Sequence, residues 1–350
     1  MHSSTDMIIR IINLRRVDNM NIAILYQTKE SPQVGNIRKP MKKGGYSDSG
    51  ADMAYELKEN GYNVILPVED PQEKNDSDWV FGDDDNGIIQ AIQKGADVIW
   101  LNTVLYDGHP IEKYIGNGVK VIGQNPSDVQ LYDDKYYTNQ LLFRHGMSVI
   151  NADLIKSADE YKGAYPCVLK PVRGRGSQGV SVISDIDALN AAISQLLSEQ
   201  IYGTEFMAEQ FLSGNEITVT VFPADNNHSA PYCLPPVLRF NHIDGIAPYN
   251  GKVAVTENSK AVENPNAYSD IMSNCSMAYE ILNLKAPIRI DCRKNADGRY
   301  VMFDVNMKPN MTLGSRKHRS NQDSLVMLAA KQAGMSRIEL LKAFIDTAWN

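Results

Sequence analysis

The sequence has few cysteines, and none of them is paired at a short spacing. Only four occur in 350 residues, at Cys167, Cys233, Cys275 and Cys292. Small domains stapled by disulfides need a denser set, and metal or redox sites commonly use a Cys-x-x-Cys motif that is missing here. A disulfide scaffold is therefore excluded, and a reducing cytoplasm is the simplest setting for this chain.

Zinc-site spacings and long apolar runs are also missing. The six histidines are scattered, without the HxxxH or HxH spacing that brings two imidazoles to one zinc ion. The longest early apolar run, Met7-Ile8-Ile9, ends at Arg10, which is too short for a signal sequence or a membrane span. We expect residues 1–19 to form an N-terminal tail, and we expect no membrane partner.

Positive charge is scarce overall. Lys and Arg number 35 against 42 Asp and Glu, which gives a formal net charge of −7. General binding of nucleic acids needs a basic face, so the balance argues against that class of function, although it permits a local basic pocket for one polyphosphate. At roughly 150 residues per domain, the length corresponds to about two domains, or three small ones.

The first third of the chain alternates apolar runs with helical segments. Such alternation predicts an α/β domain with a parallel, Rossmann-like sheet over residues 20–126. The acidic stretch 69–86 is expected to be a surface loop. Strands are expected at 21–26, 64–66, 98–101 and 119–122, and helices at 47–60, with Ser47 or Ser49 as N-cap, and at 88–93.

The remainder has an α+β pattern. Two short helices over 127–145 precede strands, a helix at 186–197 and further strands. We expect a small subdomain at 127–212 and a C-terminal subdomain at 213–350. The strands are expected at 166–170, 179–183, 206–211, 216–222, 288–293 and 300–306, with two helices after them up to Asn350.

A glycine-rich segment, Gly174-Arg175-Gly176-Ser177-Gln178-Gly179, matches GxGxxG. A dinucleotide fingerprint continues into a helix, whereas a strand follows here, and the GK[ST] end of a Walker A loop is missing. A strand–loop–strand arrangement is typical of a flap over nucleotide phosphates, or of a plain turn. Lys170, just before the loop, is a candidate phosphate ligand or an ordinary surface lysine.

Carboxylates gather on the last two strands. A turn at Asn295-Ala296-Asp297-Gly298 predicts a hairpin in which Lys294 lies opposite Arg299. In that register Asp291 faces Met302, and Arg289 faces Asp304. Period-two alternation then gives one apolar face and one polar face. The polar face carries Arg289, Asp291, Asp304 and Asn306, with Met302 as its one apolar member, and the apolar face carries Ile288, Ile290, Cys292, Val301, Phe303 and Val305.

Carboxylate and amide oxygens are ligands that Mg²⁺ prefers, and the ion bridges them to substrate phosphates. Asp291, Asp304 and Asn306 are therefore candidate ligands of one or two metal ions. Arg289 is placed to stabilise charge on a transferring phosphoryl group. The alternative is a solvated sheet face with a cross-strand Arg–Asp pair.

Together these segments resemble the ATP-grasp ligases, and most closely the D-alanine–D-alanine ligase branch. The resemblance covers about 130–315 and implies an ATP-grasp fold with a parallel N-terminal domain, a small flap subdomain and a metal-binding C-terminal subdomain. It is carried by Asp134-Lys135, by Pro166 to Pro171 with the glycine loop, by Glu209 to Glu216, by Arg289-Ile290-Asp291 and by Asp304 to Thr312.

The resemblance also implies roles for residues. Two Mg²⁺ (or Mn²⁺) would be bound by Asp291, Asp304 and Asn306, while Arg289 and the backbone N–H of Asn310 would steady the reacting intermediate. The implied reaction phosphorylates a carboxylate with ATP, after which an amine displaces phosphate and leaves ADP. The implied ATP-binding residues are Lys135, Lys170, Gly176, Ser177, Gln178, Gly179, Glu209, Gln210, Phe211, Leu212 and Glu216.

The segments expected to bind the substrates differ from the motifs of the D-alanine–D-alanine ligases. Leu101 to Gly108 stands where that branch has HGxxGEDG, and no clear equivalent of its N-terminal substrate glutamate exists. Asp304 stands for a glutamate and Asn310 for a glycine. The acceptor therefore differs from D-alanine. One candidate is mycosporine-glycine, to which similar ligases join an amino acid; others are dipeptide substrates.

Substrate contacts are less clear in the sequence. Candidates are Ser47 and Asp48 near the missing glutamate, Tyr249 and Lys252 in a Gly/Pro/Asn-rich stretch at 235–263, and Arg316 in a basic run. That stretch is either a lid or a surface excursion, and the basic run either binds an anion or is solvated.

Two other function classes stay open at this point. They are an ATP-binding module without turnover and a phosphotransferase that releases a phosphorylated product. The expected partners of the ligase are small amino acids and acids, whereas the module would sense ATP or scaffold a partner. Dimerisation is usual in this branch, although no residue here indicates a homodimer.

Overall fold

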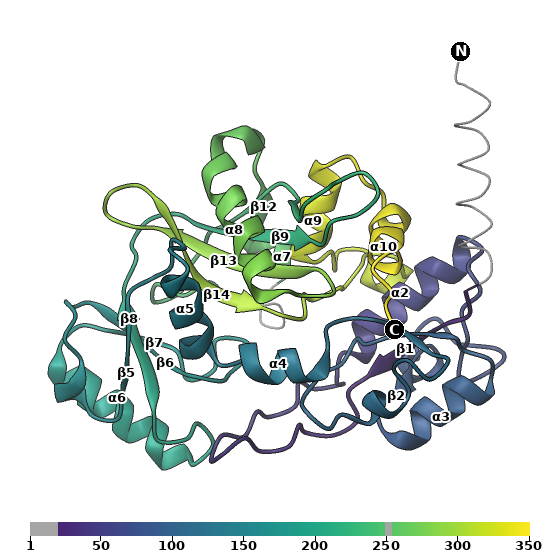
Figure 1. Ribbon diagram of the computed structural model, residues 1–350, viewed down its shortest axis with the longest axis horizontal. Coiled ribbons are helices and arrows are strands. Elements are labelled where there is room, and N and C mark those ends of the chain that lie inside the picture. Colours follow the sequence, from purple (N-terminus) through teal and green to yellow (C-terminus); the bar gives the residue numbers. More distant parts are fainter. Residues whose placement is uncertain (1–19, 249–253) are drawn as a thin grey trace.

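The computed structural model describes residues 20–248 and 254–350, whose strands form three sheets (Figure 1). The first is parallel, in the order β2-β1-β3-β4. The parallel sheet predicted from the sequence is thus confirmed. Its strands are β1 (Ile22–Tyr26), β2 (Phe81–Gly82), β3 (Val98–Trp100) and β4 (Lys120–Ile122).

Two predictions in this part were wrong. No strand forms at 64–66, where only Val64 bridges Ile22. Conversely, the acidic stretch expected to be a surface loop contains β2, because the apolar residues Trp79, Val80 and Phe81 near its end are buried. Burial of that short apolar run outweighs the polar character of the residues around it.

Helix α2 (Ser47–Glu59) forms as predicted, but neither serine caps it. Tyr46 is the N-cap, with a left-handed φ of 69° and no side-chain cap bond. The Ser49 hydroxyl instead donates to the carbonyl oxygen of Tyr46 at 3.0 Å. Helix α3 (Asp85–Gln93) has a standard cap, because the Asp84 side chain accepts from the Gly87 N–H at 2.9 Å.

The second sheet is antiparallel, in the order β5-β8-β6-β7. Helix α6 (Ile186–Glu199) covers it with Leu189, Ile193 and Leu196, whose spacing places them on one helical face. Strands β6 and β7 flank the glycine loop as predicted. The strands are β5 (Ala152–Ile155), β6 (Cys167–Pro171), β7 (Ser181–Ile183) and β8 (Phe206–Gln210).

The third sheet is the largest, with the order β12-β11-β9-β13-β14 and β10 paired to β9. Helix α8 (Ser269–Leu282) packs Ile271, Cys275 and Ala278 into the same core as Ile288 and Ile290. The strands are β9 (Glu216–Phe222), β10 (Tyr232–Cys233), β11 (Val237–Arg239), β12 (Ser259–Ala261), β13 (Ile288–Lys294) and β14 (Tyr300–Asn306).

The β13–β14 hairpin forms, but its predicted register was wrong. Lys294 pairs with Tyr300 and Cys292 with Met302; a shift then places Asp291 opposite Asp304 and Arg289 opposite Asn306. The extra residue is Phe303, which makes a β-bulge. Met302 faces the core beside Cys292, whereas Val301 and Phe303 contact a separate cluster around Met207.

The remaining helices connect these sheets. The C-terminal helix ends before Asn350, contrary to prediction, because Trp349 forms an antiparallel bridge with Val121 at the edge of the parallel sheet. The end of the chain thereby closes that edge. The helices are α4 (Pro126–Tyr132), α5 (Lys135–Arg144), α7 (Val255–Asn258), α9 (Leu325–Gln332) and α10 (Arg337–Ile345).

An aromatic cluster joins the parallel sheet to the large antiparallel sheet. The ring of Phe344 lies 5.5 Å from that of Trp100 and 5.2 Å from that of Phe222.

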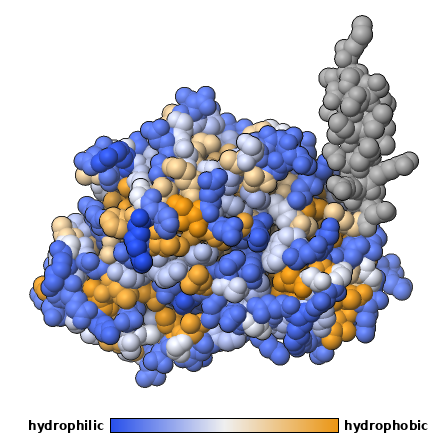
Figure 2. Space-filling model, in the orientation of Figure 1, coloured by the Kyte–Doolittle hydropathy of each residue, from blue (hydrophilic) through white to orange (hydrophobic). Residues whose placement is uncertain are grey.

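On the surface, Figure 2 shows apolar residues in separate patches among hydrophilic ones on the face in view. Within the described part of the chain, no helix combines the length and apolar character needed to cross a membrane.

The aromatic cluster predicts a large effect of Phe222→Ala. Phe222 is 1% exposed, so the truncation should lower the free energy of unfolding by about 3–5 kcal/mol. The matched control is Phe143→Ala, at a phenylalanine that is 56% exposed, with an expected change of about 0.5 kcal/mol. Urea titration followed by circular dichroism measures both, and equal losses would contradict the assignment of this cluster as a core.

Candidate active site

A cavity of about 650 Å³ is lined by residues from all three sheets. Its wall contains all the catalytic and metal-site candidates selected from the sequence, and all the ATP-site candidates except Gly179. Those present are Lys135, Lys170, Gly176, Ser177, Gln178, Glu209, Gln210, Phe211, Leu212, Glu216, Arg289, Asp291, Asp304, Asn306 and Asn310.

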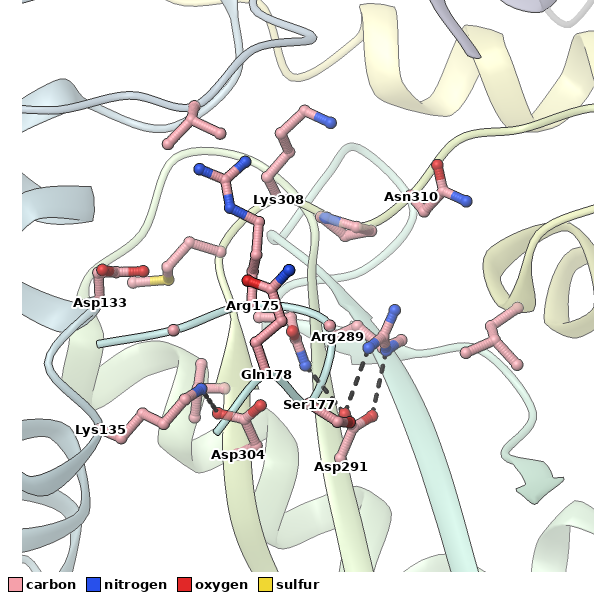
Figure 3. Close-up of a pocket in the computed structure, with 18 of the residues that line it drawn as sticks. Asp133, Lys135, Arg175, Ser177, Gln178, Arg289, Asp291, Asp304, Lys308 and Asn310 are labelled. Atoms are coloured by element: carbon pink, nitrogen blue, oxygen red, sulfur yellow. Dashed lines mark hydrogen bonds and ion pairs between the residues drawn. The ribbon is translucent and has the colours of Figure 1, made fainter. Parts of the chain in front are cut away.

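The shifted hairpin register brings the polar residues closer together than the sequence predicted. Asp291 and Asp304 lie directly opposite each other on neighbouring strands. Arg289 donates to both carboxylate oxygens of Asp291, at 3.1 and 3.2 Å, and the Asn306 amide donates to Asp291 Oδ2 at 3.0 Å. Figure 3 shows the paired carboxylates on adjacent strands, with Arg289 against Asp291.

Two lysines from other elements neutralise the remaining carboxylates. Lys135, the first residue of α5, pairs with Asp304 (Figure 3). Lys170, at the end of β6, lies 2.7 Å from Glu209 Oε2 and also donates to the carbonyl oxygen of Phe303 at 3.1 Å. The Lys170 and Glu209 side chains are only 5% and 4% exposed, so each depends on the other for its charge.

Burial and charge act against each other at these carboxylates. Burial opposes ionisation of Asp304, but Lys135, Lys170 and Arg289 together hold its pKa below the usual value. Burial similarly opposes the charge of Lys135, whereas Asp304 raises its pKa. Glu209 differs, because desolvation raises its pKa despite Lys170.

The glycine loop forms the flap that the sequence predicted, between β6 and β7. Gly179 has a φ of +70°, and a Cβ there would lie 2.9 Å from Pro171 Cγ, so the position requires glycine. Arg175 donates to Gln27 Oε1 at 3.4 Å and to the Lys39 carbonyl oxygen at 3.3 Å. These bonds attach the flap to the loop that follows β1.

Two residues beside Glu216 were missed from the sequence. His242 Nε2 lies 2.9 Å from Glu216 Oε2, and Arg293 Nη1 lies 3.9 Å from the same oxygen. The Arg293 guanidinium also lies 5.2 Å from the ring centroid of Phe211. The stretch 235–263, expected to be a lid or a surface excursion, contributes β11 and β12 to the large sheet, and nothing in its sequence marked His242.

Lys308 was not among the site residues predicted from the sequence, although it lies in the motif from Asp304 to Thr312. Its Nζ is buried and has no hydrogen-bond partner in the described residues; it sits 3.5 Å from the ring centroid of Tyr46. Burial, with nearby Lys42 and Arg175, lowers the pKa of Lys308 to about 7.

The structure does not bring the proposed substrate residue Arg316 to the cavity. Its side chain is 0% exposed and lies 2.8 Å from both Asp52 and Asp76, so its charge is already compensated. Ser47 and Asp48 lie at the start of α2, outside the cavity lining, and Asp48 pairs with Lys42 and Arg319. Tyr249 and Lys252 lie outside the described residues.

The oxygen atoms at the hairpin fit a hard cation. No group of three His, Cys, Asp or Glu side chains in the described ranges could hold a metal alone, so Asn306 would have to complete the set. Mg²⁺ commonly binds through one or two carboxylates, waters and substrate phosphates, which matches Asp291 and Asp304 beside an open cavity.

Comparisons with known proteins point to one family. The family model of the D-ala D-ala ligase C-terminus matches residues 137–346. The D-alanine–D-alanine ligase of Parabacteroides distasonis is 26% identical over 273 residues, covering 74% of this chain and 78% of that protein. That of Syntrophotalea carbinolica is 23% identical over 322 residues, covering 89% and 88%.

Solved structures confirm the expected fold. The ATP complex of D-alanine–D-alanine ligase from Bacillus anthracis has a TM-score of 0.65 at 19% identity, covering 94% of this chain and 96% of that one. The VanG D-Ala:D-Ser ligase from Enterococcus faecalis has a TM-score of 0.63 at 18% identity, covering 94% and 99%.

The buried Lys170–Glu209 pair generates a prediction that needs no ligand. Glu209→Gln leaves Lys170 without a carboxylate, so the free energy of unfolding should fall by about 3–5 kcal/mol. The control is Glu205→Gln, whose partner Lys156 is 65% exposed; a loss below about 1 kcal/mol is expected there. Urea unfolding of both variants measures the difference, and an unaffected Glu209→Gln protein would refute the coupling.

Proposed function

This chain belongs to the D-alanine–D-alanine ligase family, and we propose that it joins a small acid other than D-alanine to the amine of an amino acid. As an ATP-grasp ligase it forms a carbon–nitrogen bond and releases ADP. One observation carries the proposal. One cavity brings together the residues to which we assign phosphoryl transfer, Lys135, Lys170, Arg289, Asp291, Asp304 and Asn306. The loops that line its other side differ from the D-alanine pattern.

We assign the nucleotide to the part of the cavity between the flap and the small antiparallel sheet. Lys135 and Lys170 would bind phosphate oxygens, in exchange for their present carboxylate partners. The backbone of Gly176, Ser177 and Gln178 would close over those phosphates. Glu209, with Gln210 to Leu212, would contact the base, and Glu216 the ribose hydroxyls.

Asp291, Asp304 and Asn306 would hold the metal ions. A magnesium ion held by these residues would supply positive charge beside the phosphates. The protein's own contribution is position: Arg289 is fixed by two bonds to Asp291, so its guanidinium is held in a single orientation. In that orientation it would stabilise the negative charge that develops on the transferring phosphoryl group.

In the proposed reaction the acceptor oxygen attacks the γ-phosphorus of ATP, and ADP leaves. The amine then attacks the carbon that bears the new phosphate, and inorganic phosphate leaves with that oxygen. Arg289 and the backbone N–H of Asn310 would steady the charge on the intermediate. Most of the rate enhancement would come from positioning and charge neutralisation.

The finer proposal for the acceptor is mycosporine-glycine, whose ring oxygen rather than a carboxylate would be phosphorylated. Support comes from the residues that replace the D-alanine pattern, since Asn102 and Thr103 line the cavity where that branch has HGxxGEDG. A cytoplasmic setting stays a prediction, as does the homodimer.

The experiment that tests the proposed function is a screen for amine-dependent ADP release. The protein is incubated with ATP, Mg²⁺, mycosporine-glycine and a panel of amino acids, with D-alanine and L-amino-acid pairs as alternative substrates, and products are identified by mass spectrometry. A conjugate formed with one ADP supports the ligase. A phosphorylated product without amine use indicates a phosphotransferase, and binding without turnover indicates a regulatory module.

Asp304→Ala should abolish ADP release while the fold persists, because the metal set loses a carboxylate and Lys135 loses its partner. The control is Asp297→Ala, at an exposed aspartate in the hairpin turn, which should keep full activity. Circular dichroism establishes folding. Full activity of Asp304→Ala would remove this residue from the reaction.

Lys170→Ala should raise the KM for ATP by at least tenfold, since a charge-assisted phosphate contact is lost. Lys156→Ala is the control, because Lys156 is exposed and outside the cavity lining. Steady-state kinetics at varied ATP measure both variants. An unchanged KM in Lys170→Ala would place this lysine outside the phosphate site.

A further inference from the structure

Most cations that line the cavity already have a carboxylate. Lys135 pairs with Asp304, Arg289 with Asp291, and Lys170 with Glu209. On the side of the N-terminal domain, Lys39 lies 2.6 Å from Asp133, and Lys42 lies 3.5 Å from Asp48. In the structure each of these pairs is locally neutral.

Three cations in the described part of the cavity wall have a buried nitrogen without a hydrogen-bond partner and no carboxylate at ion-pair distance. One of them, Arg239, lies opposite Glu216 on the neighbouring strand β9 and donates to the Pro248 carbonyl oxygen at 2.8 Å. The other two are Lys308 and Arg175. Lys308 Nζ is buried with no hydrogen-bond partner among the described residues, and it lies 3.5 Å from the ring centroid of Tyr46. Arg175 donates only to uncharged oxygens, those of Gln27 and Lys39, and its Nε is buried without a partner. Burying a cation without an anion costs free energy, so an anion bound beside these two side chains would be stabilised.

Both cations lie on one side of the cavity. In Figure 3 the ends of Lys308 and Arg175 extend to the same side, away from Asp291 and Asp304. Lys308 contacts Tyr46 at the start of α2, on the N-terminal domain, whereas Lys170 contacts Glu209 in the small antiparallel sheet. Lys308 and Arg175 thus lie without a carboxylate partner on the side of the cavity away from Asp291 and Asp304.

We propose that Lys308 and Arg175 bind a carboxylate of the acceptor, separate from the oxygen that receives the phosphoryl group. This inference rests on the proposed function and names a substrate class: a small acid with a second anionic group. The same charges would repel the ammonium of a free amino acid at this position. The acceptor is thus selected both by attraction and by exclusion of zwitterions.

The test is an equilibrium binding measurement that needs no turnover. Succinate, glutarate and adipate are titrated calorimetrically into the protein with AMP-PNP and Mg²⁺, each against the monocarboxylate of equal length: butyrate, valerate or caproate. D-Alanine is titrated as the zwitterion. We expect at least one dicarboxylate to bind tenfold or more tightly than its monocarboxylate, and D-alanine to bind more weakly than that dicarboxylate.

Variants connect this preference to the two cations. Lys308→Met and Arg175→Met should each reduce the preference to threefold or less, while the Kd of AMP-PNP stays within twofold. Lys94→Met is the control, at an exposed lysine outside the cavity lining, and should keep the preference. Two variants are used so that a folding defect in one, visible by circular dichroism, does not decide the outcome.

Three results would overturn the inference. The first is a wild-type protein that prefers no dicarboxylate, or binds none. The second is a preference that survives in both folded variants. The third is a Kd of AMP-PNP that rises tenfold with the preference intact, which would assign the cations to the phosphates. Failure of the proposed function is distinct, since it would appear as absent amine-dependent ADP release whatever the calorimetry shows.

Discussion

The active-site cavity depends on one electrostatic constraint: carboxylates crowded at a buried site need cations from other parts of the chain. The hairpin register places Asp291 directly opposite Asp304, and like charges that face each other on neighbouring strands repel. Lys135 reaches Asp304 from the start of α5, 169 residues earlier in the chain, and Arg289 reaches Asp291 along the same strand. The relative placement of the sheets is therefore tied to the charge balance of the site.

The sequence predicted the residue types of this site better than their pairing. The two hairpin strands, their polar residues and the glycine flap follow from alternation and turn chemistry, which are local. The bulge at Phe303 does not, because it depends on whether Met302 or Phe303 fills the core beside Cys292. Long-range charge pairs such as Arg316–Asp52 were equally invisible, since nothing local distinguishes a buried arginine from a solvated one.

The cations that line the cavity fall into two groups, those with a carboxylate partner and those without one. Where the family resemblance is strong, at Lys135, Lys170 and Arg289, each cation already has a carboxylate that phosphates and metal would replace or share. Lys308 and Arg175 have no carboxylate partner, although both lie within segments that carry the resemblance, the one from Asp304 to Thr312 and the glycine loop. The proposed ATP site and the proposed acceptor site are compatible with a single fold, because both are built around one cavity.

The central claim is that the acceptor oxygen itself attacks ATP, and isotope transfer tests it most directly. The acceptor that supports amine-dependent turnover is prepared with ¹⁸O at the reacting oxygen, and the released phosphate is analysed by mass spectrometry. The account predicts one ¹⁸O in each phosphate, since that oxygen leaves when the amine attacks. Phosphate without ¹⁸O, formed at the same rate as the conjugate, would contradict phosphorylation of the acceptor and with it the proposed mechanism.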